Sequence, residues 1–158
     1  MEGESMTKNA IILFSGDFDK SMAAMIIANG AAAMGNEVTI FFTFWGLNLL
    51  RKPEKVNVKK PFMEKMFGSM MPRGPGEAKL SKMTWATGMM KKTMKKKNVM
   101  ELQALMEQAR AMGVRFIACT MSMDVMGMRK EELIDGLDYA GVATYIGAAD
   151  ESTITLFI

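Results

Sequence analysis

The stretch KNAIILFSGDFDKSMAAMIIANGAAAMGNEVTIFFTF, residues 8–44, decides the fold because it contains the signals of a strand, a helix and a second strand in succession. The apolar run of residues 8–16 ends in Ser-Gly, which is typical of a buried parallel strand entering a turn. Asp19 is placed to cap a helix that is apolar on nearly every side and that Gly35 closes. Residues 37–44 are β-branched and aromatic and predict a second buried strand, which completes a βαβ unit.

A similar alternation returns in the second half of the chain. Asn98 and Glu101 resemble a capping box at the start of a helix that Gly113 ends. The pattern then predicts a strand, a helix, a strand and, after a short helical turn, a last strand: residues 114–119, 130–141, 142–146 and 153–158. We therefore expect one domain over residues 1–158, an α/β/α three-layer sandwich with a mainly parallel five-stranded sheet, flavodoxin-like in the broad sense.

Residues 51–97, between the second and third strands, differ in composition from the rest of the chain. They hold fourteen lysines and arginines against three acidic residues, whereas the remainder holds six against fourteen. All four prolines fall in this insert and divide it into short pieces. Two amphipathic helices are expected here, carrying Met63, Met66, Phe67, Met70 and Met71 in the first and Met83, Trp85, Met89, Met90 and Met94 in the second.

The basic, methionine-rich insert has two interpretations. Methionine adapts to irregular surfaces, so the insert is suited to contact a partner protein, another subunit or a lipid headgroup layer. Alternatively, it is a helical excursion that covers one end of the sheet. Only Trp85 is positioned to stack on bases, so we expect no nucleic-acid partner.

The composition excludes much ordinary chemistry. With no histidine and a single cysteine, the chain has no Ser–His or Cys–His pair and no zinc site of the usual kind, and we expect neither a metal nor a cofactor. One cysteine cannot form an internal disulfide, and residues 1–10 lack the basic start and apolar region of a signal peptide. No run approaches the roughly 18 apolar residues that span a bilayer. We therefore expect a cytoplasmic protein.

Cys119, the only cysteine, ends the third predicted strand and lies in the stretch RFIACTMSMDVMG, residues 115–127. Ligand and catalytic groups of open α/β sheets gather outside the carboxyl ends of the strands. The residues that follow predict a short helix with Thr120 or Ser122 as its cap, and its free N–H groups would stabilise a thiolate. Asp124 acts in the opposite direction if its carboxylate points at the sulfur. The alternative is that Cys119 is simply a small buried hydrophobe.

The loop after the first strand, residues 15–21, belongs to the same edge of the sheet. Gly16 permits a tight turn, and the loop, which includes Asp17, leads into a helix N-terminus where backbone N–H groups can hold a small anion. A weaker hypothesis is a flavin or CoA-like group in this loop, although the glycine-rich dinucleotide and P-loop patterns are absent. The alternative is that Asp17 is an ordinary capping residue.

Three segments together resemble the DsrE/DsrF-like family, and within it the branch of DsrE-type sulfurtransferases with a long insert: residues 15–52, 70–83 and 118–127. The resemblance covers nearly the whole chain. It implies the DsrEFH-like three-layer fold, homo-oligomers, and a cysteine that accepts sulfane sulfur as a persulfide and passes it to another carrier. That cysteine falls on Cys119. The partners implied are TusA-like and rhodanese-like sulfur carrier proteins.

Two functional hypotheses follow. In the first, the protein is a sulfur-relay sulfurtransferase in which Cys119 carries the sulfur, and the pocket or its thiolate is shaped by Thr120, Ser122, Asp124, Gly16 and Asp17. This chemistry needs one accessible thiol and no histidine, metal or second cysteine. In the second, the protein is a non-catalytic assembly module whose insert docks a partner or a membrane surface. We expect the insert to form a subunit interface and part of the pocket over Cys119.

Overall fold

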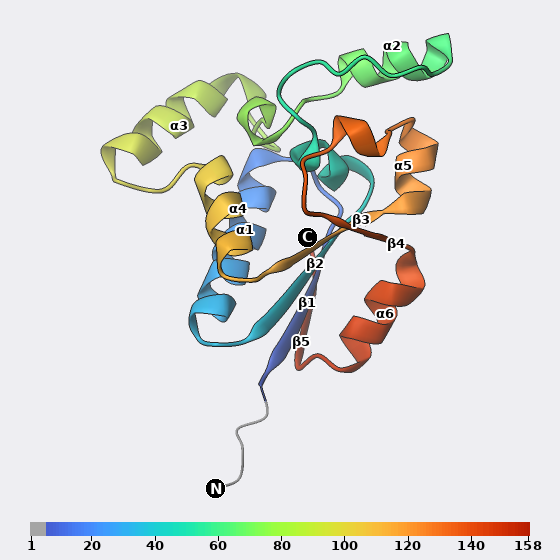
Figure 1. The fold of residues 1–158 in the computed structure, drawn as a ribbon. Helices are drawn as coiled ribbons and strands as arrows, with labels where there is room; N and C mark the ends of the chain where they lie inside the picture. The colour runs from blue at the N-terminus through green and yellow to red at the C-terminus, as the bar shows by residue number, and fades with distance from the viewer. Residues whose placement is uncertain (1–5) are drawn as a thin grey trace, which may run out of the picture.

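The computed structural model describes residues 6–158 and contains one five-stranded sheet in which every pairing is parallel (Figure 1). The strand order is β4-β3-β2-β1-β5. The strands are β1 Lys8–Leu13, β2 Glu37–Phe42, β3 Arg115–Cys119, β4 Asp138–Ala140 and β5 Ile154–Phe157. The mainly parallel sheet is therefore confirmed. The first five residues, which belong to the segment assessed above for a signal peptide, lie outside the described residues.

Helices cover both faces of the sheet, as Figure 1 shows, and the three-layer sandwich is confirmed. The long helix α1, Phe18–Ala33, and α4, Leu102–Ala111, pack together on one face, and α6, Val142–Asp150, lies on the other. The central strands are almost continuously apolar because they are buried on both sides. A large core fills the α1–α4 side, and a smaller cluster fills the α6 side.

Two predicted elements between the third and last strands were wrong. Residues 130–141 form no long helix: a 3₁₀ turn, η4 Lys130–Glu132, precedes the short strand β4. Residues 142–146 form no strand, because they begin α6 after Gly141, which is extended. The physical reason is tertiary: the second face of the sheet must be covered, and a helix over residues 142–150 buries Tyr145 against it. The chain does end in a strand, as expected.

Two predicted helix caps were also wrong. Helix α4 begins at Leu102 rather than at Asn98, which has a positive φ of 57° and lies before the helix. Asp19 lies inside the first turn of α1. Its carboxylate instead accepts hydrogen bonds from Ser81, from the backbone N–H at 2.8 Å and from the hydroxyl at 2.6 Å. Asp19 therefore attaches the insert to α1.

The insert contains two helices where two amphipathic helices were expected, but Met71, Met83 and Trp85, which were expected in them, lie outside. The two helices are α2, Phe62–Met70, and α3, Thr87–Lys96, with the 3₁₀ turns η1 Phe44–Leu50, η2 Pro75–Glu77 and η3 Thr84–Ala86 around them. The insert also contributes Met71, Ala78 and Leu80 to the large core. Figure 1 shows α2 and α3 at the carboxyl end of the strands. No helix within residues 6–158 is both long enough and apolar enough to cross a membrane.

Candidate functional site

Cys119 is the last residue of β3 and the N-cap residue of α5, Thr120–Met126. The sequence had predicted both the strand end and the short helix that follows. The thiol has no disulfide partner, and only 2% of the residue is exposed. The first-turn N–H groups of α5 begin directly after the thiol-bearing residue, so a thiolate here would lie at the positive end of a helix dipole.

The thiol lies on the face of the sheet that α6 covers. Cys119 belongs to the small cluster with Phe41 of β2 and Tyr145 of α6, and none of the insert residues is in this cluster. The rings of Phe41 and Tyr145 lie 5.6 Å apart between centroids. Tyr145 is the only buried residue of α6, and burial raises the pKa of its phenol, which keeps it neutral. Helix α6 therefore covers the thiol, and Tyr145 is the one large side chain that packs it against the sheet.

Ser122 is fully buried, and its hydroxyl lies 2.7 Å from the hydroxyl of Thr43. Thr43 directly follows β2, so this hydrogen bond joins the end of β2 to α5, the helix that follows β3. Either hydroxyl can donate. The bond fixes α5 against the sheet edge just beyond Cys119.

The other two residues predicted near the thiol lie on the same short helix. Thr120 is half-buried at its first position, next to Cys119. Asp124 is exposed one turn later, and its side chain accepts no hydrogen bond within residues 6–158. The structure thus brings Thr120 and Ser122 to the start of α5 with Cys119 and leaves Asp124 facing solvent.

Gly16 and Asp17 lie after β1, on the far side of β2 from β3. A Cβ on Gly16 would lie 2.5 Å from the carbonyl oxygen of Trp45, so the glycine allows η1 to pass close to the loop. Asp17 is the N-cap residue of α1 and pairs with Lys20 at 3.2 Å. Gly16 therefore has a packing role, Asp17 forms a surface ion pair without capping α1 through its side chain, and neither contact reaches Cys119.

A buried ion pair and a hydrogen bond attach the insert to the C-terminal end of α5. Lys60 donates to both oxygens of Glu132, at 2.8 and 2.9 Å, and to the carbonyl of Gly127 at 2.9 Å. Only 7% of the Lys60 side chain and 9% of the Glu132 side chain are exposed. Nearby, Arg129 pairs with Glu64 of α2 at 3.0 Å. The insert therefore braces the helix that follows Cys119.

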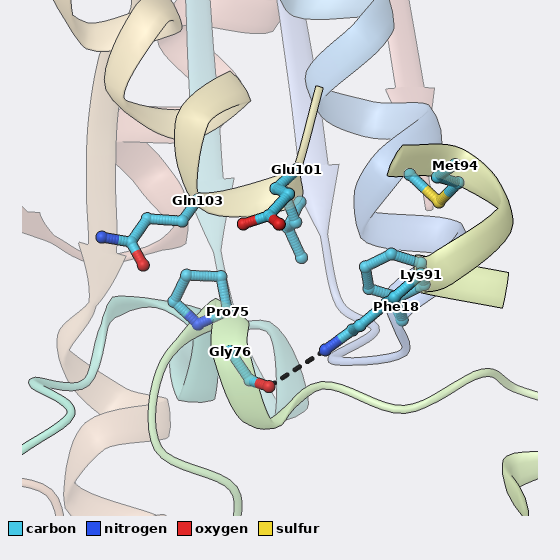
Figure 2. Close-up of a pocket in the computed structure, with 8 residues that line it drawn as sticks. Phe18, Pro75, Gly76, Lys91, Met94, Glu101 and Gln103 are labelled. Carbon is cyan, nitrogen blue, oxygen red and sulfur yellow. Dashed lines mark hydrogen bonds between the residues drawn. The ribbon is translucent and has the colours of Figure 1, made fainter. Parts of the chain in front are cut away.

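A cavity of about 220 Å³ lies under the insert on the α1–α4 side (Figure 2). Phe18 of the loop predicted to hold an anion lines it, together with Lys91, whose ammonium lies 5.1 Å from the Phe18 ring centroid. Lys91 also donates to the carbonyl of Gly76 at 3.0 Å, the dashed line in Figure 2. The backbone N–H of Phe18 donates to the backbone carbonyl of Lys79 in the insert. The loop is thus occupied by contacts with the insert. Within residues 6–158 no three metal-ligating side chains are grouped.

Four residues that shape the site were not predicted from the sequence: Thr43, Lys60, Glu132 and Tyr145. Thr43 lies near the end of the strand predicted over residues 37–44, so its position close to the sheet edge was visible in the sequence. Tyr145 was assigned to a strand and Glu132 to a helix, which concealed their roles. No local signal pairs Lys60 with Glu132, because 72 residues separate them.

The comparisons with known proteins agree with the fold. The model of the DsrE/DsrF/DrsH-like family matches residues 5–157. The chain is 56% identical to the uncharacterized protein YrkE of Bacillus subtilis (strain 168), over 98% of this chain and 99% of that protein. It is 40% identical to the sulfur carrier protein DsrE2 of Allochromatium vinosum, over 96% of this chain and 98% of that protein.

Two solved structures share the fold at low sequence identity. The ychN protein of E. coli is 12% identical with a TM-score of 0.57, over 97% of this chain and all of that one. The protein MTH1491 of Methanobacterium thermoautotrophicum, described as of unknown function, is 14% identical with a TM-score of 0.58, over 95% of this chain and 98% of that one.

Proposed function

Because the chain belongs to the DsrE/DsrF/DrsH-like family, we propose that it is a sulfur-relay protein in which Cys119 accepts sulfane sulfur as a persulfide and passes it to a carrier protein. One observation carries the proposal: the single cysteine stands at the carboxyl end of a central strand and at the start of a helix. The 40% identity to a sulfur carrier protein supports it. A TusA-like or rhodanese-like carrier is the partner class that fits this role.

The transfer needs no oxidant and no second cysteine. The Cys119 thiolate attacks the outer sulfur of a donor persulfide, R–S–SH, and forms a new S–S bond. The S–S bond of the donor breaks, its electron pair leaves with the donor thiolate, and Cys119 becomes a persulfide. Transfer onward repeats the same exchange with an acceptor thiolate. The helix-start N–H groups assist when Cys119 attacks and when it leaves.

The buried position of Cys119 requires that its cover open for a partner. Helix α6 is suited to this movement because it buries one residue, Tyr145, while Val142 is 61% and Ile146 50% exposed. Segments with few buried apolar contacts open at low free-energy cost. Helix α5 is a poor candidate, because the Thr43–Ser122 bond and the Lys60–Glu132 pair fix both of its ends.

Intact-mass spectrometry tests the proposal. The protein is incubated with polysulfide or a low-molecular-weight persulfide, desalted and compared with Cys119→Ser. The expected result is a gain of about 32 Da per sulfur on the wild type alone. A Cys119 that neither gains sulfur nor reacts with an alkylating agent in the folded state would refute the proposal and make the thiol a core residue.

A second candidate function, docking, is favoured by the exposed apolar side chains of the insert. Phe62 and Met70 of α2 are 76% and 77% exposed, and Trp85, just before the lysine-rich α3, is 75% exposed. Scattered exposed apolar residues are ordinary, but a group of large ones marks an interaction surface. The insert's positive charge favours an acidic surface on the partner, and we propose that a sulfur carrier protein docks there.

The docking surface is tested without removing the insert, since Met71, Ala78 and Leu80 belong to the core. Binding of a purified TusA-like carrier to the wild type is compared with Trp85→Ser and, as a matched control, with Lys8→Gln at the other end of the sheet. Loss of binding in Trp85→Ser alone supports the proposal. Insert-dependent self-association in ultracentrifugation, or flotation with anionic but not neutral vesicles, would assign the surface to a second copy or a membrane instead.

A further inference from the structure

A second cavity lies on the α4 side of the sheet, the side opposite to Cys119, and three of its lining residues are arginines. It has a volume of about 240 Å³, and Arg51, Arg73 and Arg110 line it. The rest of the wall is largely apolar, contributed by Leu49, Pro53, Pro75, Met106 and Ile134. An apolar cavity with a few convergent polar groups is the usual form of a small-molecule site.

The cavity arginines differ from the other arginines of the chain in their partners. The chain has five arginines. The two outside the cavity each pair with a carboxylate, Arg115 with Asp138 and Arg129 with Glu64. The three that line the cavity take part in no ion pair within residues 6–158. Guanidinium groups without carboxylates are thus concentrated in one place.

Arg51 is the deepest of the three and is 2% exposed. Its guanidinium donates to the carbonyls of Met71 and Pro72, both at 3.0 Å, and of Gly68 at 2.9 Å. A guanidinium has five N–H groups, so two remain for a ligand. Burial, and then the positive charge of Arg73, lowers the pKa of Arg51 from its usual value, against the opposing negative charges of Glu132 and Glu77. An anion beside Arg51 would offset the unfavourable burial of its charge and the repulsion from Arg73.

Two carboxylates also line the cavity, and each is engaged elsewhere. Glu77 accepts a hydrogen bond from the backbone N–H of Arg73 at 2.7 Å, and Glu107 accepts one from the side chain of Gln103 at 3.0 Å. Both glutamates are exposed, whereas Arg51 is buried. With three arginines and two glutamates in the lining, one positive charge is left in excess.

The neighbouring cavity of Figure 2 provides an internal comparison, since it shares Pro75, Gly76 and Gln103 with this one. Its cation, Lys91, already donates to the carbonyl of Gly76, and the carboxylate of Glu101 lies on the same wall. That cavity has one lysine and one carboxylate, so its charges balance. The arginine-lined cavity keeps one positive charge in excess, while Arg51 donates to three carbonyls and Arg110 to the carbonyl of Asp135.

We propose that the arginine-lined cavity binds a small organic anion. Its apolar body packs on the aliphatic wall, and its oxyanion head accepts hydrogen bonds from the three guanidinium groups. Planar guanidinium groups match carboxylates and related oxyanions with paired hydrogen bonds. The volume of about 240 Å³ is below the roughly 300–1,000 Å³ of sites for drug-sized ligands, so the ligand is small. This binding activity is independent of sulfur transfer at Cys119.

Hexanoate is the probe for a direct test, with 1-hexanol and hexylamine as neutral and cationic molecules of equal length. Binding is followed by NMR of isotope-labelled methionine methyl groups, with the Met106 signal assigned from Met106→Leu. The expected result is a saturable shift of the Met106 methyl group, with hexanoate binding roughly tenfold tighter than hexanol and hexylamine not binding.

Substitutions identify the head-group contacts. Arg73→Gln is expected to weaken hexanoate binding roughly tenfold without changing hexanol binding, and the control Arg115→Gln to change neither. Arg73 is half-exposed and its side chain donates no hydrogen bond within residues 6–158, so Arg73→Gln should fold. If the methyl spectrum of Arg73→Gln shows a disturbed fold, Arg110→Gln replaces it in the test. The absence of a saturable Met106 shift, or equal binding of hexanoate and hexanol that ignores the arginines, would overturn the proposal.

Discussion

Replacing Tyr145 with alanine tests whether α6 is the movable cover of the thiol. Tyr145 is 5% exposed, is the only buried residue of α6 and packs with Cys119 and Phe41. Truncating a buried aromatic residue costs about 3–5 kcal/mol, and we take the lower figure because a half-exposed helix can settle into the space. If the thiol reacts through opening of α6, about 3 kcal/mol of lost closing energy raises its alkylation rate roughly 100-fold.

The assay is the rate of alkylation of Cys119 under native conditions, with three controls. Tyr145→Phe keeps the packing, and the tyrosine hydroxyl has no partner within residues 6–158, so the rate should stay within about twofold of wild type. Ile146→Ala, on the exposed side of the same helix, should also have little effect. Leu105→Ala destabilises the opposite face by a comparable amount. A Tyr145→Ala rate equal to wild type, or an equal acceleration by Leu105→Ala, would refute local opening of α6.

Three further predictions concern the frame of the site. Lys60→Met leaves the Glu132 charge buried and should lower the free energy of unfolding in urea by about 3–5 kcal/mol, whereas Lys8→Met, at an exposed pair, should change it far less; equal losses would contradict the bracing role. Gly46→Ala places a Cβ 2.1 Å from a backbone oxygen and should lower the melting temperature, whereas Gly30→Ala, with nothing within 4 Å, should raise it slightly; the reverse order would contradict the close approach. Burial raises the pKa of Asp19, but the hydrogen bonds from Ser81 outweigh burial and hold the pKa below 3.8 in the folded protein. The carboxylate therefore stabilises the insert fully above pH 3.8, and this stabilisation is lost as the pH falls through the lower folded pKa. Hydrogen exchange in the insert should accelerate at that pH, and an unchanged exchange rate would contradict the prediction.

The sequence predicted the half of the fold that local patterns determine. The run of residues 8–44 and the strand ending at Cys119 were placed correctly, because buried parallel strands are continuous apolar runs and glycines mark their exits. The short helix after Cys119 followed from the same local pattern. These elements are enough to place the thiol at the carboxyl edge of the sheet.

Residues 130–146 were misassigned because long-range contacts decide their structure. Residues 130–141 include helix-forming types, yet Glu132 forms an ion pair with Lys60 and the N–H of Ile134 donates to the carbonyl of Leu50. These long-range contacts hold the backbone extended. Residues 142–146 are rich in strand-forming types, yet they form the helix that the uncovered face of the sheet needs. The covering of Cys119 by Tyr145 depends on the same contacts and was therefore not predicted.

A sulfur-transfer experiment shows whether Cys119 relays sulfur or only fills space in the core. Wild-type protein loaded with sulfane sulfur and desalted is mixed with a reduced, purified TusA-like carrier, and both masses are recorded over time. We expect about 32 Da to leave this protein and appear on the carrier, and Cys119→Ser to transfer nothing. Sulfur that never loads, or that loads and stays on Cys119 in the presence of the carrier, would contradict the relay role of Cys119.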